Sequence, residues 1–147
     1  MTHAPSSDSR RLALRGALAL LGAFTLAACG ADAAKTPLSL SLEEGRDLFE
    51  ARQVLLIDIR EPREHASGVV SGALLLPASQ FKYRMAEIPK DPAQPVLIIC
   101  NTQNRSRILV RTMQQAGWSN VRYVRGGMST WARQGWPMVR PGAQTSS

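Results

Sequence analysis

Cysteine and histidine are scarce in this chain, which has two of each among 147 residues. A zinc site takes four protein ligands, or three and a water, so most multi-ligand zinc sites are excluded. Acidic residues are also few, with 11 Asp and Glu against 18 Lys and Arg, and none follows Asp91. The formal charge of +7 suggests an anionic partner. The length fits one domain.

The first 28 residues have the pattern of an export signal. Arg10, Arg11 and Arg15 precede an uncharged, mostly aliphatic run over residues 16–28, which ends in small residues. This run has 13 residues, whereas a helix that spans a bilayer needs about 20, so the pattern disfavours a retained transmembrane anchor. The paired arginines also resemble a twin-arginine export signal, and the export route stays open.

Residues 26–29 (Leu-Ala-Ala-Cys) resemble the lipobox of bacterial lipoproteins, in which the cysteine is acylated and becomes the mature N-terminus. We therefore expect removal of residues 1–28, a lipid on Cys29 and a short tether over 29–37. The product would be a lipid-anchored protein of the bacterial cell envelope that faces the periplasm. Cleavage after residues 31–33 would instead release a soluble periplasmic protein. Either form of export argues against nucleic acid as the anionic partner.

Short aliphatic runs of the kind found in buried parallel strands recur along the rest of the chain. They cover residues 54–58, 73–76, 96–100 and 121–124, and residues 38–40 could form a first strand. Helical patterns alternate with these runs, which predicts an α/β fold with a central parallel sheet of about five strands and helices on both faces.

Three helices are indicated by spacing and by capping residues. Ser41 and Glu44 form a capping box that begins a helix ending near Arg52. A second helix carries Phe81, Met85 and Ile88 after a possible Ser79 cap, and a third carries Leu109, Met113 and Ala116 before a terminating Gly117.

With Cys29 acylated or cut away, Cys100 is the one free thiol expected in the mature protein, and a lone thiol in an oxidising compartment needs an explanation. Residues 96–107 predict a strand, a tight loop and a helix N-terminus, where backbone amides and the helix dipole favour an anion. This field, with the charge of Arg105, favours thiolate. We expect Cys100 to be an exposed nucleophile in a loop that binds an anion, although a free Cys is more commonly a small buried hydrophobe.

Three separated segments resemble the signatures of single-domain rhodaneses, a family of sulfurtransferases. They are residues 58–65 (DIREPREH) with 68–73 (GVVSGA), similar to D-x-R-x-x-x-E-aromatic and G-H-I-x-G-A; residues 100–106 (CNTQNRS), similar to C-x-x-G-x-R-S; and residues 126–137 (GGMSTWARQGWP), similar to G-G-x-x-x-W-x-x-x-G-x-P. The resemblance implies a rhodanese-like domain over residues 38–140, followed by a tail over 141–147 that we expect to be disordered.

The resemblance also implies a ping-pong reaction in which Cys100 becomes a persulfide. The donor would be a small sulfur anion such as thiosulfate, and the acceptor a thiol or cyanide. Arg105 would steer the donor, and no metal or organic cofactor is implied. The predicted substrate-binding residues are those of the loop, Asn101, Thr102, Gln103, Asn104, Arg105 and Ser106.

The sequence departs from the family pattern at Gln103, which stands at the usual glycine of the loop and predicts a strained or differently turned backbone. A non-catalytic binding module, or a thiol or persulfide sensor, therefore stays open. A phosphatase would need arginine after five intervening residues, where this chain has Ser106. We interpret Asp58 and Arg60 as structural residues that pair with Glu61 or Glu64.

Overall fold

The computed structural model describes residues 37–142. The predicted signal peptide, Cys29, the tether up to residue 36 and the tail from residue 143 lie outside these residues. Within residues 37–142, no helix is long and apolar enough to span a membrane.

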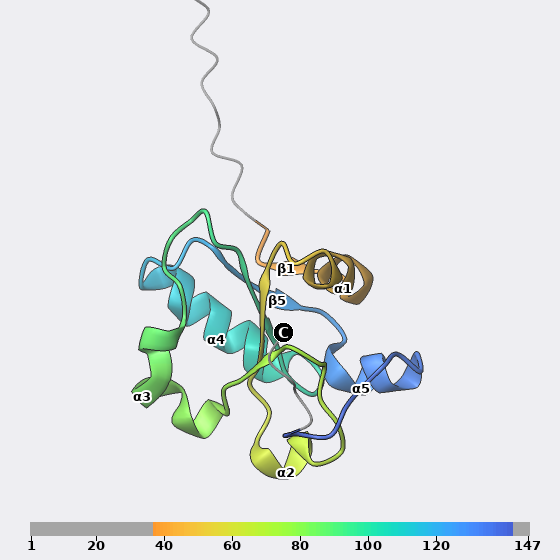
Figure 1. Cartoon of the computed structure of the whole chain (residues 1–147). Helices are drawn as coiled ribbons and strands as arrows, with labels where there is room; N and C mark the ends of the chain where they lie inside the picture. Colours follow the sequence, from red (N-terminus) through yellow and green to blue (C-terminus); the bar gives the residue numbers. More distant parts are fainter. Residues whose placement is uncertain (1–36, 143–147) are drawn as a thin grey trace, which may run out of the picture. The chain divides into compact units, whose positions relative to one another are not determined.

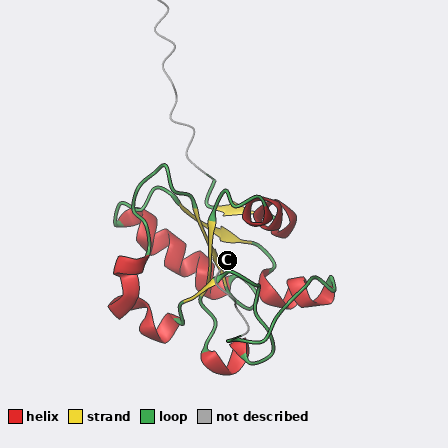
Figure 2. Cartoon of the chain, in the orientation of Figure 1, coloured by secondary structure: helices red, strands yellow, loops and turns green. Residues whose placement is uncertain are grey.

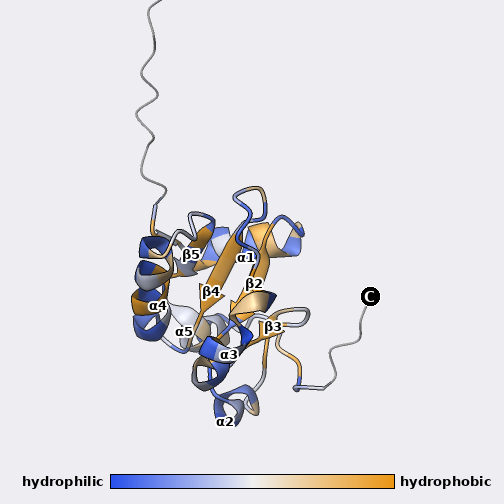
Figure 3. Ribbon diagram, turned by 90° about the vertical axis from the view of Figure 1, so that its left-hand side faces the viewer, coloured by the Kyte–Doolittle hydropathy of each residue, from blue (hydrophilic) through white to orange (hydrophobic). Residues whose placement is uncertain are grey.

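Five parallel strands form one sheet in the order β1-β5-β4-β2-β3. The strands are β1 (Ser39–Leu40), β2 (Leu55–Asp58), β3 (Leu74–Leu75), β4 (Val96–Ile99) and β5 (Val121–Val124). All four residues of the central strand β4 are buried, which explains its uninterrupted aliphatic sequence. Figure 3 shows β2 and β4 coloured as hydrophobic. The predicted parallel sheet is confirmed, and each strand lies within its predicted range.

Helices cover both faces of this sheet, as predicted (Figures 1 and 2). They are α1 (Leu42–Glu50), α2 (Pro62–His65), α3 (Phe81–Arg84), α4 (Asn104–Gln115) and α5 (Gly127–Arg133), with 3-10 turns at Ala78–Gln80 and Met85–Glu87 on either side of α3. One core cluster joins the sheet to α3 and α4 through Phe81, Val110 and Met113. A second joins it to α1 and α5 through Leu42 and Trp131.

The predicted helix ends are right at two places and wrong at one. Ser41 and Glu44 form the expected capping box, with bonds of 3.1 and 2.9 Å, and Gly117 follows α4 at φ +92°. Ser79 does not cap α3, which begins after Gln80. The Ser79 hydroxyl and amide instead donate to the carboxylate of Glu61, so its hydrogen bonds stabilise a contact to α2.

Candidate active site

Cys100 directly follows β4, at the carboxyl end of the central part of the sheet, where sites form in open parallel sheets. Its carbonyl accepts a hydrogen bond of 2.9 Å from the Met128 amide at the start of α5. The residue is only 1% exposed and belongs to the core cluster beneath α4. The expectation of an exposed cysteine is therefore wrong, because the chain on both sides of the sulfur packs closely around it.

The loop after Cys100 has the predicted passage into a helix N-terminus. In the part of the chain that the structure describes, no backbone amide from Asn101 to Ser106 donates a hydrogen bond to another protein group. Asn101, Thr102 and Asn104 are exposed, and α4 begins at Asn104. Free amides at the start of a 12-residue helix favour an anion, so the loop can bind one beside the sulfur.

Ser106 is the loop residue whose side chain lies against the sulfur. It is fully buried, and its Oγ lies 3.4 Å from the Cys100 Sγ. The same hydroxyl donates to the Gln103 carbonyl at 3.1 Å. Because a hydroxyl has one proton, Ser106 can accept from the Cys100 thiol while it donates to Gln103, or share that proton with the thiolate.

Arg105 does not stand free as an anion-steering charge. Its guanidinium donates two hydrogen bonds of 2.8 and 2.6 Å to the carboxylate of Glu64, from α2. These bonds lower the pKa of Glu64 to about 2, so this carboxylate is ionised at neutral pH. The same bonds raise the pKa of Arg105, and the nearby charges of Glu64 and Cys100 add to the effect. The pair therefore places a largely compensated charge beside the loop.

Glu64 is a residue of the site that the sequence analysis missed. The available signal was its place as the acidic residue of the first motif, yet its partner lies 41 residues later in the chain. The predicted pairing of Arg60 with the carboxylate of Glu61 or Glu64 is wrong. Arg60 pairs with Asp58 at 2.7 Å. The carboxylate of Glu64 is already bound by Arg105 and the Glu61 amide, and Arg60 instead donates to the Glu64 and Gly68 carbonyls.

Gln103 has the strained backbone that its sequence position predicts. Its φ of +150° with ψ of −11° lies in a region that side chains rarely adopt, at a cost of about 1–3 kcal/mol. Its Oε1 accepts a hydrogen bond of 3.0 Å from the Gly126 amide, in the turn between β5 and α5. The side chain thus contacts that turn, and only its backbone amide belongs to the predicted anion site.

The turn between β5 and α5 lies directly against the cysteine loop. The Met128 and Ser129 amides donate to the carbonyls of Cys100 and Asn101 at 2.9 and 2.8 Å. Gly127 has φ +65°, and a Cβ there would lie 2.5 Å from both of those carbonyl oxygens. Only glycine fits this approach. The Gly126–Gly127 pair therefore supports the loop through backbone contact.

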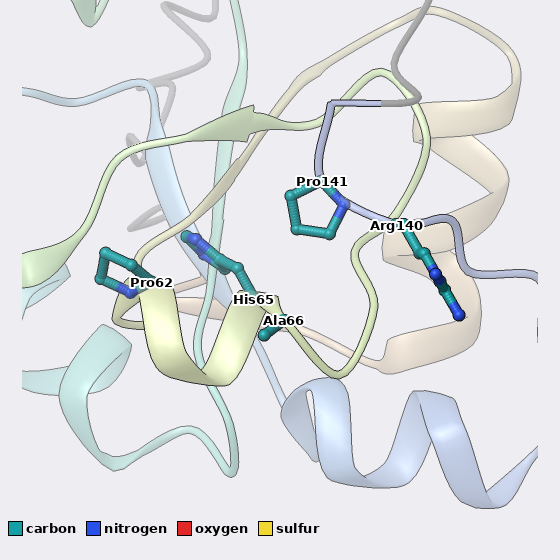
Figure 4. Close-up of a pocket in the computed structure, with 5 residues that line it drawn as sticks. All are labelled: Pro62, His65, Ala66, Arg140 and Pro141. Carbon is teal, nitrogen blue, oxygen red and sulfur yellow. The ribbon is translucent and has the colours of Figure 1, made fainter.

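A hollow of about 550 Å³ lies beside α2, lined by Pro62, His65, Ala66, Arg140 and Pro141 (Figure 4). None of these residues belongs to the Cys100–Ser106 loop. The His65 side chain is buried, with its Nε2 3.6 Å from an Asp58 carboxylate oxygen, so His65 packs beside the Asp58–Arg60 pair. Among the described residues, no group of three or more His, Cys, Asp and Glu could hold a metal ion.

The comparisons with known proteins all point to one family. The family model of the rhodanese-like domain matches residues 41–134. A sulfurtransferase of Allochromatium vinosum is 43% identical over 94 residues, which cover 64% of this chain and 86% of that protein.

Two solved structures are also similar. A rhodanese-related protein from Thermoplasma volcanium has 28% identity and a TM-score of 0.60, over 70% of this chain and 98% of that one. A thiosulfate sulfurtransferase from Pseudomonas aeruginosa has 29% identity and a TM-score of 0.60, over 69% of this chain and 20% of that one. This chain belongs to the rhodanese-like domain family.

Proposed function

We propose that this protein is a sulfurtransferase that moves a sulfane sulfur from a small anionic donor such as thiosulfate to a thiol or cyanide, through a persulfide on Cys100. The observation that carries the proposal is the position of Cys100 at the start of the loop that leads into α4. The six amides of this loop donate to no protein group among the described residues. Both the family and the sulfurtransferase relative support this class of reaction.

In the first half-reaction the Cys100 thiolate attacks the outer sulfur of thiosulfate. A sulfur–sulfur bond forms to Cys100 while the one in thiosulfate breaks, and sulfite leaves with the bonding electron pair. In the second, an acceptor thiolate attacks the outer sulfur of the persulfide, and the Cys100 thiolate leaves. The acceptor carries the sulfur away, so electrons balance without an external oxidant or a cofactor.

The residues of the loop have distinct roles in this mechanism. The amides of Asn101, Thr102, Gln103, Asn104, Arg105 and Ser106 stabilise negative charge on the persulfide and on the leaving sulfite. The Ser106 hydroxyl, 3.4 Å from the sulfur, can share its proton between the thiolate and the Gln103 carbonyl. Because Glu64 compensates its charge, Arg105 acts chiefly by holding the loop, and the amides supply most of the attraction for the donor.

The test is incubation of the protein with thiosulfate, followed by measurement of sulfite and of the protein mass. We expect sulfite release together with the mass increase of one sulfur atom on the Cys100 peptide, and neither in Cys100→Ser. Absence of both in the native protein would overturn the proposal. Substantial turnover of phosphate esters would instead favour a phosphatase.

A persulfide- or thiol-sensing module, or a binding module without turnover, is the second candidate. The burial of Cys100 and the strained Gln103 favour it, because both limit access to the sulfur. Persulfide formation in one stoichiometric step, without continued turnover when cyanide or a thiol is supplied, would select this candidate.

We also propose that Cys29 carries a lipid that anchors the protein to a bacterial membrane, facing the periplasm. The lipobox-like residues 26–29 support this proposal. Radiolabelled fatty acid should label the native protein and leave Cys29→Ala unlabelled. Equal labelling of the two would refute the anchor and favour a soluble periplasmic protein.

A further inference from the structure

Gln103 occupies a backbone conformation that glycine adopts more readily than any residue with a side chain. Its φ of +150° and ψ of −11° differ from those of Arg52, the other described non-glycine residue with positive φ, whose φ of 57° is ordinary for a turn. Such a conformation persists only where the surroundings hold it in place. The glutamine side chain must therefore be part of what holds this loop.

Gln103 is hydrogen-bonded on two sides. Its carbonyl accepts from the Arg107 amide at 2.8 Å and from the Ser106 hydroxyl at 3.1 Å, both on α4. Its side-chain Oε1 accepts from the Gly126 amide at 3.0 Å, on the turn before α5. The residue thus bridges the helix that begins at the loop and the turn that faces it.

The first residues of α5, which directly follow that turn, already hold the loop at two earlier carbonyls, those of Cys100 and Asn101. With Gln103, the segment from Cys100 to Gln103 is bound at three points to the turn and the start of α5, and the third bond depends on a side chain. A glycine at residue 103 would leave two. The enclosed cysteine is 1% exposed, so the loop must move before a bulky molecule reaches the sulfur.

We propose that Gln103 is a positioning residue that latches the cysteine loop to the Gly126 turn and restricts the Cys100 sulfur to small reagents. The consequence for sulfur transfer rests on the proposed function: small donors and acceptors reach the sulfur through small movements of the loop that leave the Gln103–Gly126 bond intact, whereas a large thiol acceptor requires this bond to open. The latch itself rests on geometry alone.

Two variants test the latch. Gln103→Met keeps the length of the side chain but removes the acceptor, and Gln103→Gly removes both the acceptor and the strain. The matched control is Gln114→Met, near the other end of α4. It also deletes a bond between a glutamine side chain and the backbone, the 2.9 Å bond from Gln114 Nε2 to the Val121 carbonyl. For each full-length protein, Cys100 is alkylated with iodoacetamide or with a bulky maleimide, and the Cys100 peptide is followed by mass spectrometry, which separates it from Cys29.

We expect both Gln103 variants to react with the bulky maleimide about tenfold faster than the native protein, a factor that corresponds to about 1.4 kcal/mol. With iodoacetamide we expect the rate to change by at most about twofold, because this small reagent does not require the hydrogen bond to open. Gln114→Met should leave the ratio of the two rates unchanged. General loosening of the fold would instead accelerate both reagents alike, in Gln114→Met as well.

An unchanged ratio of rates in both Gln103 variants would overturn the latch, and so would acceleration of both reagents by the same factor. If Gln103→Met folds poorly, Gln103→Gly still decides the matter, because glycine relieves the strain. Alkylation needs no sulfur donor, so a negative thiosulfate experiment leaves the latch result intact. A positive thiosulfate experiment likewise does not depend on the latch.

Discussion

The two sides of the cysteine loop are held by different physics. On the side of α2, side-chain charges hold it: Arg105 binds Glu64, and behind that pair Arg60 binds Asp58. On the side of α5, uncharged groups make the contact. Amides at the start of the helix donate to the carbonyls of Cys100 and Asn101, and the Gln103 side chain adds one bond from the Gly126 amide.

This difference determines how each side can fail. The Arg105–Glu64 pair is partly exposed, at 38% and 25%, so salt and pH can weaken it gradually. The backbone contact carries no net charge and depends on the close approach of Gly127, where one added methyl group cannot be accommodated. We therefore expect changes at the exposed charges of the α2 side to have small, graded effects on stability. Substitutions at buried contacts on either side should have large effects.

The largest effect is expected at the buried end of the α2 side. Arg60→Leu leaves the Asp58 carboxylate, which is 1% exposed, without its guanidinium. An unpaired buried charge costs about 3–5 kcal/mol, which should appear in urea unfolding at neutral pH. The control is the double variant Asp58→Leu with Arg60→Leu, which should recover much of the loss because no charge is stranded. If the double variant loses as much stability as the single one, packing and not charge determines the stability of this region.

The second effect tests the α5 side. In Gly127→Ala the new Cβ would lie 2.5 Å from the Cys100 and Asn101 carbonyl oxygens, so the loop or the turn must move. We expect a loss of about 3 kcal/mol in the free energy of unfolding. We also expect a fall of about 100-fold in sulfur-transfer rate, because reacting groups are displaced.

Gly135 provides a matched control for that variant. Its φ of +66° is close to the +65° of Gly127, but nothing lies within 4 Å of a Cβ placed there. Gly135→Ala should therefore cost about 1 kcal/mol, the conformational penalty alone. Equal losses in the two variants would mean that positive φ, and not close approach, makes Gly127 necessary.

The sequence allows the fold to be predicted better than the contacts of the loop. Strand β4 is recognisable because all of its residues are aliphatic, and α1 because Ser41 and Glu44 lie within one turn. These signals are local. The Glu64–Arg105 pair joins residues 41 apart and the Gln103–Gly126 bond residues 23 apart, so neither can be read from spacing.

The wrong predictions have the same origin. Ser79 has the local pattern of a cap, but its partner is Glu61, 18 residues earlier. Cys100 follows a strand at the expected edge of the sheet, yet its exposure depends on how closely the α5 turn packs. The backbone of Gln103 was the exception, because a departure from glycine at one position is itself a local signal.

A smaller effect is expected from pH on the α2 side. The folded pKa of Glu64, about 2, lies below its ordinary value of 4.5, so its pairing stabilises the fold above about pH 5 and this contribution is lost as pH falls toward 2. Because the pair is partly exposed and solvent screens it, we expect it to contribute about 1 kcal/mol to the free energy of unfolding. Glu64→Gln should therefore be less stable than the native protein at pH 6, and the difference should vanish near pH 2.

The control for this pH series is Glu87→Gln, which breaks the pair of Glu87 with Arg84. The Glu87 carboxylate is more exposed than that of Glu64, at 41% against 25%. This variant should show a smaller difference across the same range, because solvent screens that pair more strongly. A larger pH-dependent difference in Glu87→Gln than in Glu64→Gln would contradict the expectation that the Glu64–Arg105 pair is the more stabilising of the two pairs.

The smallest effect concerns attraction of the donor. Glu64→Gln removes the negative charge that compensates Arg105, so the loop should attract anions more strongly and kcat/KM for thiosulfate should rise about two- to fivefold at low salt. The gain should shrink as salt is added, because the freed charge is exposed to solvent. The matched measurement uses cysteine persulfide as donor, at a pH where its net negative charge is smaller than that of thiosulfate. We expect a smaller rise in kcat/KM for this donor. A fall in kcat/KM for both donors would instead mean that the pair serves to hold the loop and that its geometry outweighs the added charge.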